Sequence, residues 1–256
     1  MHSSSLGYRL WAARAKLPAP LRRWLRARLP CLKAWPPLGM VWFGGLRRLQ
    51  PIDESYGWKR GQPIDRYYIE RFLSTHTPDI RGNVLEIGDD RYTRRFGGDG
   101  VTKSDVLHFV ESYLKATIVA DLTCADHVPS NSFDCIICTQ TLQMIYDVRA
   151  AVRTLYRILK PGGVLLVTSH GISKIGRRLG VDPWGEYWHF TAQSVQRLFE
   201  EVFLSGNVTV EAYGNILAAI SFLEGLASEE LKPHELEYRD PNYEVLVTVR
   251  AVKSGR

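Results

Sequence analysis

Five strand candidates of this 256-residue chain carry, at or near their ends, residues that could do chemistry. The candidates are segments 83–87, 101–109, 116–120, 133–139 and 164–168. The groups near their ends are Gly88-Asp89-Asp90, Ser104-Asp105, Asp121-Leu122, Cys138-Thr139-Gln140 and Ser169-His170. A carboxylate is a double acceptor suited to a vicinal diol, and Asp105 stands 17 residues after Gly88, near the spacing of a ribose-binding acid. These residues predict a ligand site at one edge of a sheet.

The elements that must position these residues alternate between strand and helix. Helical spacing of apolar residues covers 63–73, 149–159, 192–202 and 215–226, and two further strands are expected over 208–213 and 243–252. Lys160-Pro161-Gly162-Gly163 should stop the second of these helices with a turn. The pattern predicts an α/β fold: a Rossmann-like three-layer sandwich with a mostly parallel seven-stranded sheet whose last strand is antiparallel. Ligands of such sheets bind beyond the carboxyl ends of the strands.

The order of these motifs resembles the class I S-adenosylmethionine-dependent methyltransferases. The likeness is nearest to the small-molecule group that includes the ubiquinone-type enzymes, and it covers residues 80–170 well and 182–203 loosely. It is carried by the segments 84–88, Asp105, Asp121-Leu122, 131–137 and 156–163. The resemblance implies S-adenosyl-L-methionine as the cofactor and a transferase activity.

The resemblance also implies roles for individual residues. Glu86 and Gly88 would shape the first strand-to-helix loop around the methionine part of the cofactor, and Asp105 would accept hydrogen bonds from the ribose. Asp121 and Leu122 would border the adenine, while Thr139 and Gln140 would form the floor beneath the sulfonium. Taken alone, either aspartate would be better explained as a helix N-cap or turn residue.

Asp90 departs from the family pattern, because a second glycine usually stands at that position of the cofactor loop. An aspartate tolerates a left-handed backbone better than most residues, so the loop can still turn. Two alternatives remain at this point: a rearranged cofactor loop that includes Asp90, or a degenerate, non-catalytic one. Arg91, Arg94 and Arg95 follow, either as partners of the cofactor's carboxylate or as a solvated helix face.

Transfer to an oxygen acceptor of high pKa would need a base, for which His170 and His189 are the catalytic candidates. Asp182 and Glu186 could support them, and Trp184, Tyr187 and Trp188 could form the acceptor wall. The alternative for either histidine is a structural role. No clustered Asp/Asn pattern suggests a metal, so none is expected.

Two other segments could cover the site. Before the first strand, Arg60, Asp65 and Tyr67 are candidate lid contacts, or else ordinary packing residues of a helix on the sheet. The insertion 213–242 contains an apolar helix that could cap the acceptor site or make a dimer contact. Cys135 and Cys138 lie in a buried strand and point to opposite faces, which favours a structural role over a redox or metal one.

Charge divides the chain into residues 1–50, a basic Trp-rich extension, and residues 51–256, the methyltransferase domain. The extension holds ten basic and no acidic residues, a charge of +10, so the remainder of the net +6 chain sums to −4. Within the domain we expect a cofactor half near 80–170 and an acceptor-side region near 171–242. Residues 21–29 should form a short basic amphipathic helix, which could lie on an anionic membrane or pack on the domain.

The sequence therefore predicts a methyltransferase acting on a hydroxyl of a small metabolite, a sugar or a lipid-linked precursor. The alternatives are a non-catalytic binding or scaffold protein and a nucleic-acid methyltransferase whose basic extension grips phosphate; nucleic acid is the less favoured partner. A cytoplasmic location is the default expectation, with peripheral membrane contact through residues 1–50 and an organellar transit peptide as alternatives.

Overall fold

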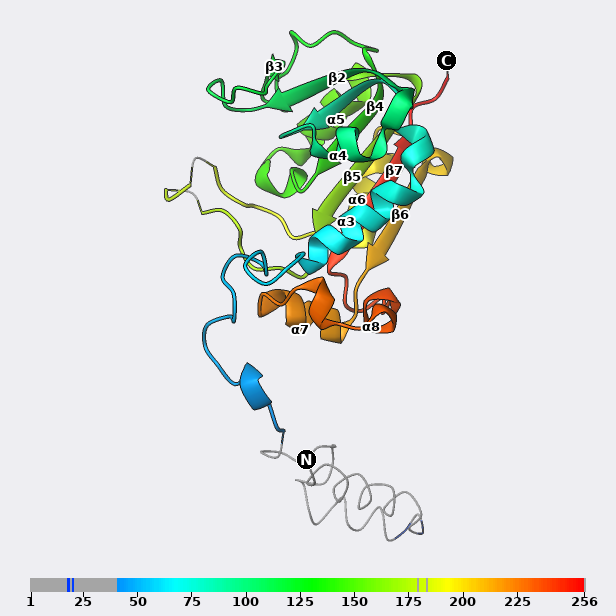
Figure 1. Ribbon diagram of the computed structural model, residues 1–256. Helices are drawn as coiled ribbons and strands as arrows, with labels where there is room; N and C mark the ends of the chain where they lie inside the picture. Colours follow the sequence, from blue (N-terminus) through cyan, green and yellow to red (C-terminus); the bar gives the residue numbers. More distant parts are fainter. Residues whose placement is uncertain (1–17, 19, 21–40, 179, 183, 256) are drawn as a thin grey trace. The chain divides into compact units, whose positions relative to one another are not determined.

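The computed structural model describes residues 18, 20, 41–178, 180–182 and 184–255. The amphipathic helix predicted over 21–29 lies outside these residues. The chain divides between Leu49 and Gln50 into two units, of which the second, Gln50–Arg256, holds the sheet (Figure 1). In the described part of the first unit, a 3-10 helix, η2 (Gly44–Leu46), interrupts an exposed segment. No helix among the described residues has the length and apolar character needed to cross a bilayer.

Seven strands form one sheet in the order β3-β2-β1-β4-β5-β7-β6. The strands are β1 (Gly82–Ile87), β2 (Val101–His108), β3 (Ile118–Val119), β4 (Phe133–Thr139), β5 (Leu159–His170), β6 (Val208–Tyr213) and β7 (Leu246–Val252). The pairs from β3 to β5 are parallel, whereas β7 runs antiparallel to both β5 and β6. The predicted Rossmann-like, mostly parallel seven-stranded sheet with an antiparallel last strand is confirmed.

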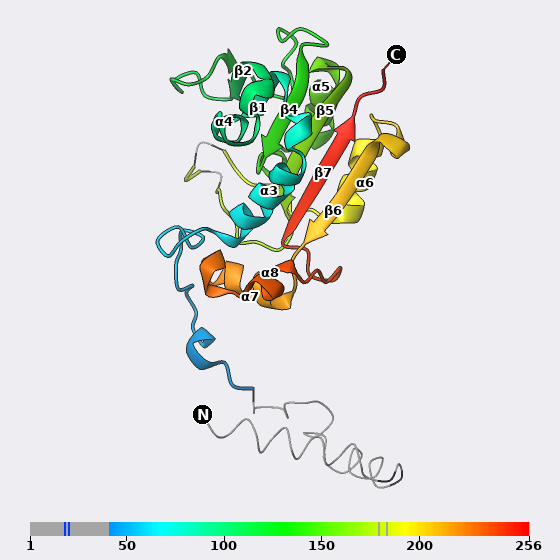
Figure 2. The same cartoon turned by 45° about the vertical axis from the view of Figure 1, so that its right-hand side comes forward.

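Helices cover both faces of this sheet (Figures 1 and 2). They are α3 (Ile64–Thr75), α4 (Arg91–Phe96), α5 (Val148–Ile158), α6 (Ala192–Glu200), α7 (Ile216–Leu223) and α8 (Pro233–Glu237), with 3-10 turns η3 (Thr77–Asp79), η4 (Gly98–Gly100), η5 (Leu142–Met144), η6 (Ser205–Asn207) and η7 (Ser228–Glu230). One core cluster joins α5 and α6 to the sheet, and a second joins α3, α4 and α7 to the opposite face.

The alternation of side chains along β4 explains how one strand serves both cores. Ile136 and Cys138 belong to the cluster with α5 and α6, while Cys135 and Ile137 belong to the cluster with α3. Both cysteines are buried and unpaired. Burial raises the pKa of the Cys138 thiol to about 12, which disfavours a reactive thiolate. The predicted structural placement of the pair on opposite faces is confirmed.

Residues 160–163 behave differently from the predicted turn. The structure continues β5 through them from Leu159, with a register shift between the pairs Phe133–Leu159 and Cys135–Val164. Gly162 takes a φ of +77° and its N–H donates to the Lys253 carbonyl, while the Lys253 N–H donates to Gly163. The glycines therefore make a bulge within the strand, because an adjoining chain segment supplies partners for their backbone groups.

Candidate active site

A cavity of about 1090 Å³ lies at the carboxyl edge of the parallel strands. Ile87, His108, Thr139 and His170, the last residues of β1, β2, β4 and β5, all line it. Register explains their convergence, since Ile87 pairs with Leu107 and Thr139 pairs with Thr168. The cavity lies where the strand order reverses between β1 and β4, the place predicted for a ligand site in this class of sheet.

Gly88 makes the turn at the end of β1. Its φ of +99° is unfavourable for residues with a side chain, and a Cβ built on it would meet no atom within 4 Å. Gly88 thus presents bare backbone to the cavity, which it lines. Asp90, in contrast, has an ordinary φ of −111°, forms an ion pair with Arg94 and does not line the cavity.

Glu86 lies behind this loop rather than in the cavity. Its buried carboxylate accepts hydrogen bonds from the Tyr92 and Thr93 N–H groups at 3.1 and 2.7 Å and from the Thr93 hydroxyl at 2.8 Å. These are donors of the first turn of α4, so Glu86 fixes the helix that follows the loop. Burial nevertheless raises the pKa of Glu86 to about 7, against the lowering effect of these hydrogen bonds.

The end of β2 places His108, not Asp105, at the cavity. Asp105 is buried opposite Leu85, where it accepts a hydrogen bond from Thr117 at 3.0 Å and pairs with Lys103 at 2.7 Å. Nδ1 of His108 accepts from the Val110 N–H at 2.9 Å, so Nε2 carries the hydrogen and can donate to a ligand. His108 is not among the predicted site residues, although the strand predicted over 101–109 runs past Asp105 to the observed strand end.

Four other predicted cofactor residues do line the cavity: Asp121, Leu122, Thr139 and Gln140. Oδ1 of Asp121 accepts from the N–H and the hydroxyl of Thr123, both at 2.8 Å, and Leu122 is buried beside it. Gln140 has a φ of +50°, one of three non-glycine residues with positive φ in the described chain. Backbone strain of this kind persists where the surroundings impose it and often marks a functional site.

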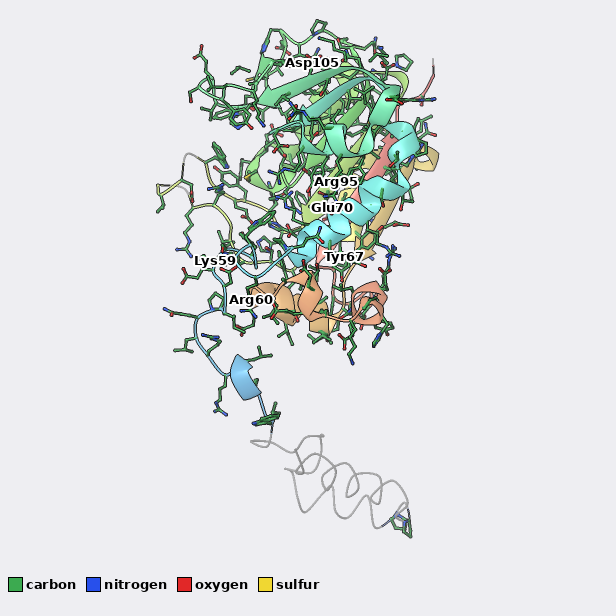
Figure 3. The ribbon with its side chains drawn as sticks, viewed as in Figure 1. Lys59, Arg60, Tyr67, Glu70, Arg95 and Asp105 are labelled. Atoms are coloured by element: carbon green, nitrogen blue, oxygen red, sulfur yellow. The ribbon has the colours of Figure 1, made fainter. Side chains whose placement is uncertain are left out.

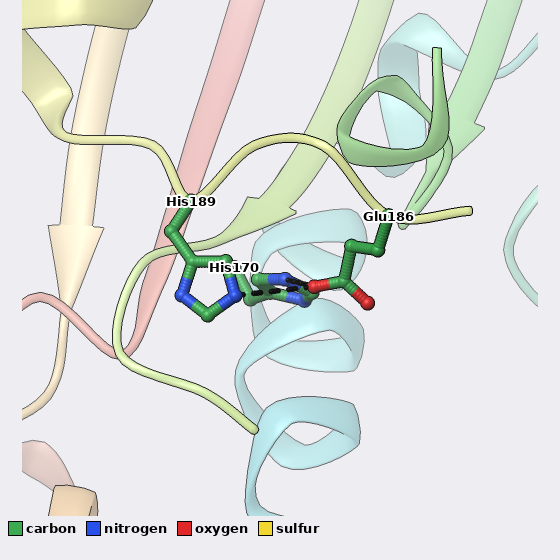
Figure 4. Close-up of side chains that lie close together, drawn as sticks. All are labelled: His170, Glu186 and His189. Carbon is green, nitrogen blue, oxygen red and sulfur yellow. Dashed lines mark hydrogen bonds and ion pairs between the residues drawn. The ribbon is translucent and has the colours of Figure 1, made fainter. Parts of the chain in front are cut away.

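His170, Glu186 and His189 form a cluster on the other side of the cavity (Figure 4). Nε2 of His170 lies 2.6 Å and Nε2 of His189 lies 3.2 Å from the same oxygen, Oε1 of Glu186. Since an ionised carboxylate only accepts, Nε2 of His170 carries the hydrogen and Nδ1 keeps its lone pair. Burial lowers the pKa of His170, against the opposing effect of Glu186, so the neutral ring is favoured. His170 and Glu186 line the cavity, whereas His189 does not.

Of the predicted lid residues, Asp65 lines the cavity, together with its neighbour Arg66. Arg60 and Tyr67, both labelled in Figure 3, are engaged elsewhere. Arg60 pairs with Glu230, and the Tyr67 hydroxyl donates to Glu237 at 2.5 Å. Two other residues that precede the first strand, Tyr56 and Trp58, line the cavity, although they are not among the predicted lid contacts.

The arginines after the first loop also separate. Arg91 lines the cavity and lies 3.4 Å from Asp89, whereas Arg95 pairs with Glu70 of α3 (Figure 3). Arg94 is occupied by Asp90. Arg94 and Arg95 thus fit the solvated helix face, and Arg91 and Arg66 are the cations of this region that a ligand carboxylate can reach.

Aromatic residues line the cavity together with His170 and Glu186, and we refer to this part of the lining as the acceptor side. Tyr56, Tyr146, Trp184 and Tyr187 line the cavity, and Phe222 of α7 joins them from the insertion 213–242. Burial, reinforced by Glu186, raises the pKa of Tyr56 to about 12, so this phenol stays protonated. Trp188 lies outside the lining and donates from Nε1 to the Ile145 carbonyl at 3.0 Å. Asp182 holds Arg177 at 3.1 Å and does not reach the histidines.

Comparison with known proteins identifies the family. Residues 108–167 match the family model described as "Methyltransferase domain". Over 156 residues the chain is 26% identical to the ubiquinone/menaquinone biosynthesis C-methyltransferase UbiE of Klebsiella pneumoniae subsp. pneumoniae, covering 54% of this chain and 55% of the relative. Over 203 residues it is 32% identical to phosphoethanolamine N-methyltransferase 1 of Arabidopsis thaliana, covering 75% of this chain and 35% of the relative. The chain belongs to the class I S-adenosylmethionine-dependent methyltransferases.

A solved structure agrees with this methyltransferase fold. The [4+2]-cyclase SpnF superposes with a TM-score of 0.50 at 15% identity, over 76% of this chain and 84% of that one. Over 91 residues the chain is 34% identical to the ubiquinone/menaquinone biosynthesis C-methyltransferase UbiE of Haemophilus ducreyi, covering 35% of this chain and 29% of the relative. The chain thus spans about half or less of the curated relatives named here.

The residues of this methyltransferase cavity fit S-adenosyl-L-methionine. The open space beside Gly88 admits a ligand close to the backbone, and the carboxylate of Asp121 with the buried side chain of Leu122 offers the polar and apolar contacts that a purine needs. Arg66 and Arg91 supply positive charge for a carboxylate. His108 offers a donor at the strand end where a ribose is expected.

Proposed function

We propose that this protein transfers the methyl group of S-adenosyl-L-methionine to a hydroxyl oxygen of a small acceptor, a metabolite, a sugar or a lipid-linked precursor. The observation that carries the proposal is the His170–Glu186 pair beside the cofactor half of one cavity. A cavity of about 1090 Å³ exceeds what one small ligand usually fills, which suits a cofactor and an acceptor together.

The bound cofactor supplies an electrophilic methyl group on a sulfonium. For this chain's residues, the main task is to align the acceptor and to exclude water, and the aromatic side chains of Tyr56, Trp184 and Tyr187 suit that task. Nδ1 of His170 accepts the proton of the acceptor hydroxyl as the oxygen attacks. Glu186 holds the ring and stabilises the imidazolium that forms.

The structure also bears on the non-catalytic alternative, which Asp90 motivated. Because Asp90 adopts an ordinary backbone conformation and its carboxylate pairs with Arg94 outside the cavity, it places no obstacle beside Gly88. The departure from the family pattern is therefore compatible with a working cofactor loop, which favours the enzyme over a scaffold protein.

Two measurements test the proposed function. Calorimetry should detect 1:1 binding of S-adenosylhomocysteine, the product of the reaction. A transfer assay with tritium in the methyl group, over a panel of hydroxyl, amine and activated-carbon acceptors, should then label a hydroxyl compound with an O-methyl product. No product binding contradicts the methyltransferase activity, and labelling of nitrogen or carbon acceptors alone contradicts the oxygen acceptor.

We further propose that residues 41–49 make peripheral contact with an anionic membrane. Val41, Trp42, Phe43, Leu46 and Leu49 are all exposed there, and Arg47 and Arg48 add positive charge. Sedimentation with vesicles containing phosphatidylglycerol should recover the full chain, and a Trp42→Ser, Phe43→Ser variant should be recovered less. Leu204→Ser, a change at an exposed leucine of the other unit, is the control. Equal recovery of all three proteins would overturn this proposal.

A cytoplasmic location stays a prediction.

A further inference from the structure

The cluster of His170, Glu186 and His189 has more ligand capacity than a base and its partner require. A single base needs one orienting group, yet here two imidazoles converge on one carboxylate oxygen (Figure 4). One ring nitrogen of each histidine and a carboxylate oxygen of Glu186 all lie within 4.8 Å of one another. The two rings are nearly perpendicular, with an interplanar angle of 74° and centroids 4.8 Å apart, so their nitrogens approach from different directions.

These three groups are chemically a transition-metal ligand set. Imidazole nitrogen and carboxylate oxygen bind Zn²⁺ at roughly 2.0–2.2 Å, and two histidines with one glutamate leave a position open. Binding such an ion would open the 2.6 Å hydrogen bond between His170 and Glu186 and bring the three donor atoms to about 2 Å from the metal.

The surroundings hold the cluster in place. Oε2 of Glu186 accepts from the Gly176 N–H at 2.6 Å, which orients the carboxylate while leaving Oε1 toward the histidines. Side-chain exposure is 9% for His170, 3% for Glu186 and 35% for His189. Outer contacts of this kind tune real metal sites. Because His170 and Glu186 line the cavity, an ion bound here would lie at the wall of the cavity.

We propose that His170, Glu186 and His189 form a binding site for Zn²⁺ or a similar borderline divalent ion such as Co²⁺ or Ni²⁺. Coordination through Nε2 moves the ring hydrogen of each neutral histidine to Nδ1, with no net change in protons. Resting on the proposed function, the consequence is inhibition: the Nδ1 lone pair that would accept the acceptor's proton is no longer free. The site is thus a place where zinc switches off transfer.

The sequence did not indicate this site, because 16 residues separate His170 from Glu186 and no compact metal motif links them. The end of β5 and the segment leading into α6 meet only in the folded chain. A hydrogen-bonded relay is the competing interpretation of the same contacts, and the experiment separates the two.

The experiment uses the full chain without purification histidines, stripped of metal with a chelator that is then removed. Zinc chloride titrated in a calorimeter should bind one ion per chain, and Co²⁺ should give the visible absorption of a low-symmetry site. Changing one ligand should cost at least about 100-fold in affinity, since even outer-contact changes cost 10–100-fold. His189→Ala is therefore expected to lose the site, whereas His234→Ala, at an exposed histidine of α8, should bind as the unchanged chain does.

The outcomes are decisive in both directions. Equal zinc affinity of the unchanged chain and of His189→Ala and His170→Ala, or no stoichiometric binding, would overturn the metal site and leave the hydrogen-bonded relay. His189→Ala lies outside the cavity lining, and its melting temperature and binding of S-adenosylhomocysteine report whether it is folded. Failure of the proposed function is seen separately: chelated protein that binds no S-adenosylhomocysteine contradicts that function without affecting zinc binding.

Discussion

The two sides of the cavity are built in different ways. On the cofactor side, Gly88, His108, Asp121 and Thr139 stand at or just after the ends of consecutive parallel strands, so sheet register positions them. On the acceptor side, Tyr56, Glu186 and Tyr187 come from irregular segments that are tied down by individual hydrogen bonds, such as that from the Tyr187 N–H to the Gln143 carbonyl at 2.8 Å. The first construction tolerates little change, whereas the second can vary with the acceptor while the sheet stays the same.

The largest expected effect lies on the acceptor side. His170→Asn removes the proposed base, so kcat with a hydroxyl acceptor should fall by about 10²–10⁴-fold, the usual contribution of general base catalysis. The affinity for S-adenosylhomocysteine should stay within about threefold, because His170 belongs to the other side of the cavity. Single-turnover transfer and calorimetry measure the two quantities. A matching loss of cofactor affinity would erase the division between the two sides.

The next effect lies on the cofactor side. Gly88→Ala puts a methyl group into the space beside the backbone and strains a φ of +99°, so the dissociation constant of S-adenosylhomocysteine should rise by about 10–100-fold. Gly98→Ala is the matched control, since Gly98 also has positive φ (+53°) and open space for a Cβ but lies outside the cavity. Equal affinity losses in the two variants would show that strain alone is responsible.

The same contrast explains what the sequence could predict. The strands predicted from the sequence form the observed sheet. Of the residues predicted at their ends, Gly88, Asp121, Leu122, Thr139 and Gln140 line the cavity. Charge and spacing favour Asp105, but the strand predicted over 101–109 ends later, and His108, the last residue of β2, lines the cavity instead. Local pattern predicts which strand contributes, and position along the strand decides which residue.

The acceptor side was less predictable because its residues meet through tertiary contacts. His170 and His189 are predictable as polar residues near a strand end and in an aromatic segment, but their shared contact with Glu186 arises only in the tertiary structure. Tyr56 precedes Glu186 by 130 residues, and the sequence around it carries no local signal that it lines the same cavity. Such juxtapositions follow from packing and not from periodicity.

Glu86 gives a third prediction, on stability behind the cofactor loop. Its pKa is raised from 4.5 to about 7 in the folded chain, so the folded state binds its proton more tightly than the unfolded state does. The contribution of protonated Glu86 to the free energy of unfolding is therefore fully present below pH 4.5 and is lost as the pH rises to about 7. Between those two pH values the unchanged chain should lose on the order of 1–3 kcal/mol of its free energy of unfolding through Glu86. Glu86→Gln, which cannot ionise, should not show this loss.

Urea unfolding of both proteins across that pH range measures the effect of Glu86. Glu200→Gln, at an exposed position of α6, is the control and should leave the pH dependence of the free energy of unfolding unchanged. A constant difference in the free energy of unfolding between Glu86→Gln and the unchanged chain from pH 4.5 to 7 would show that burial does not raise the pKa of Glu86.

The smallest expected effect concerns the residue that departs from the family pattern. Asp90→Gly restores the glycine, yet Asp90 has an ordinary φ of −111° and its carboxylate is paired with Arg94 outside the cavity. Cofactor affinity should therefore change by less than about threefold. The free energy of unfolding should fall by up to about 1 kcal/mol, because a partly exposed i,i+4 ion pair and backbone stiffness are lost. A tenfold gain in affinity for S-adenosylhomocysteine would show instead that Asp90 obstructs the loop. Because Gly88 alone makes the turn, the cofactor side needs one glycine at this loop and not two.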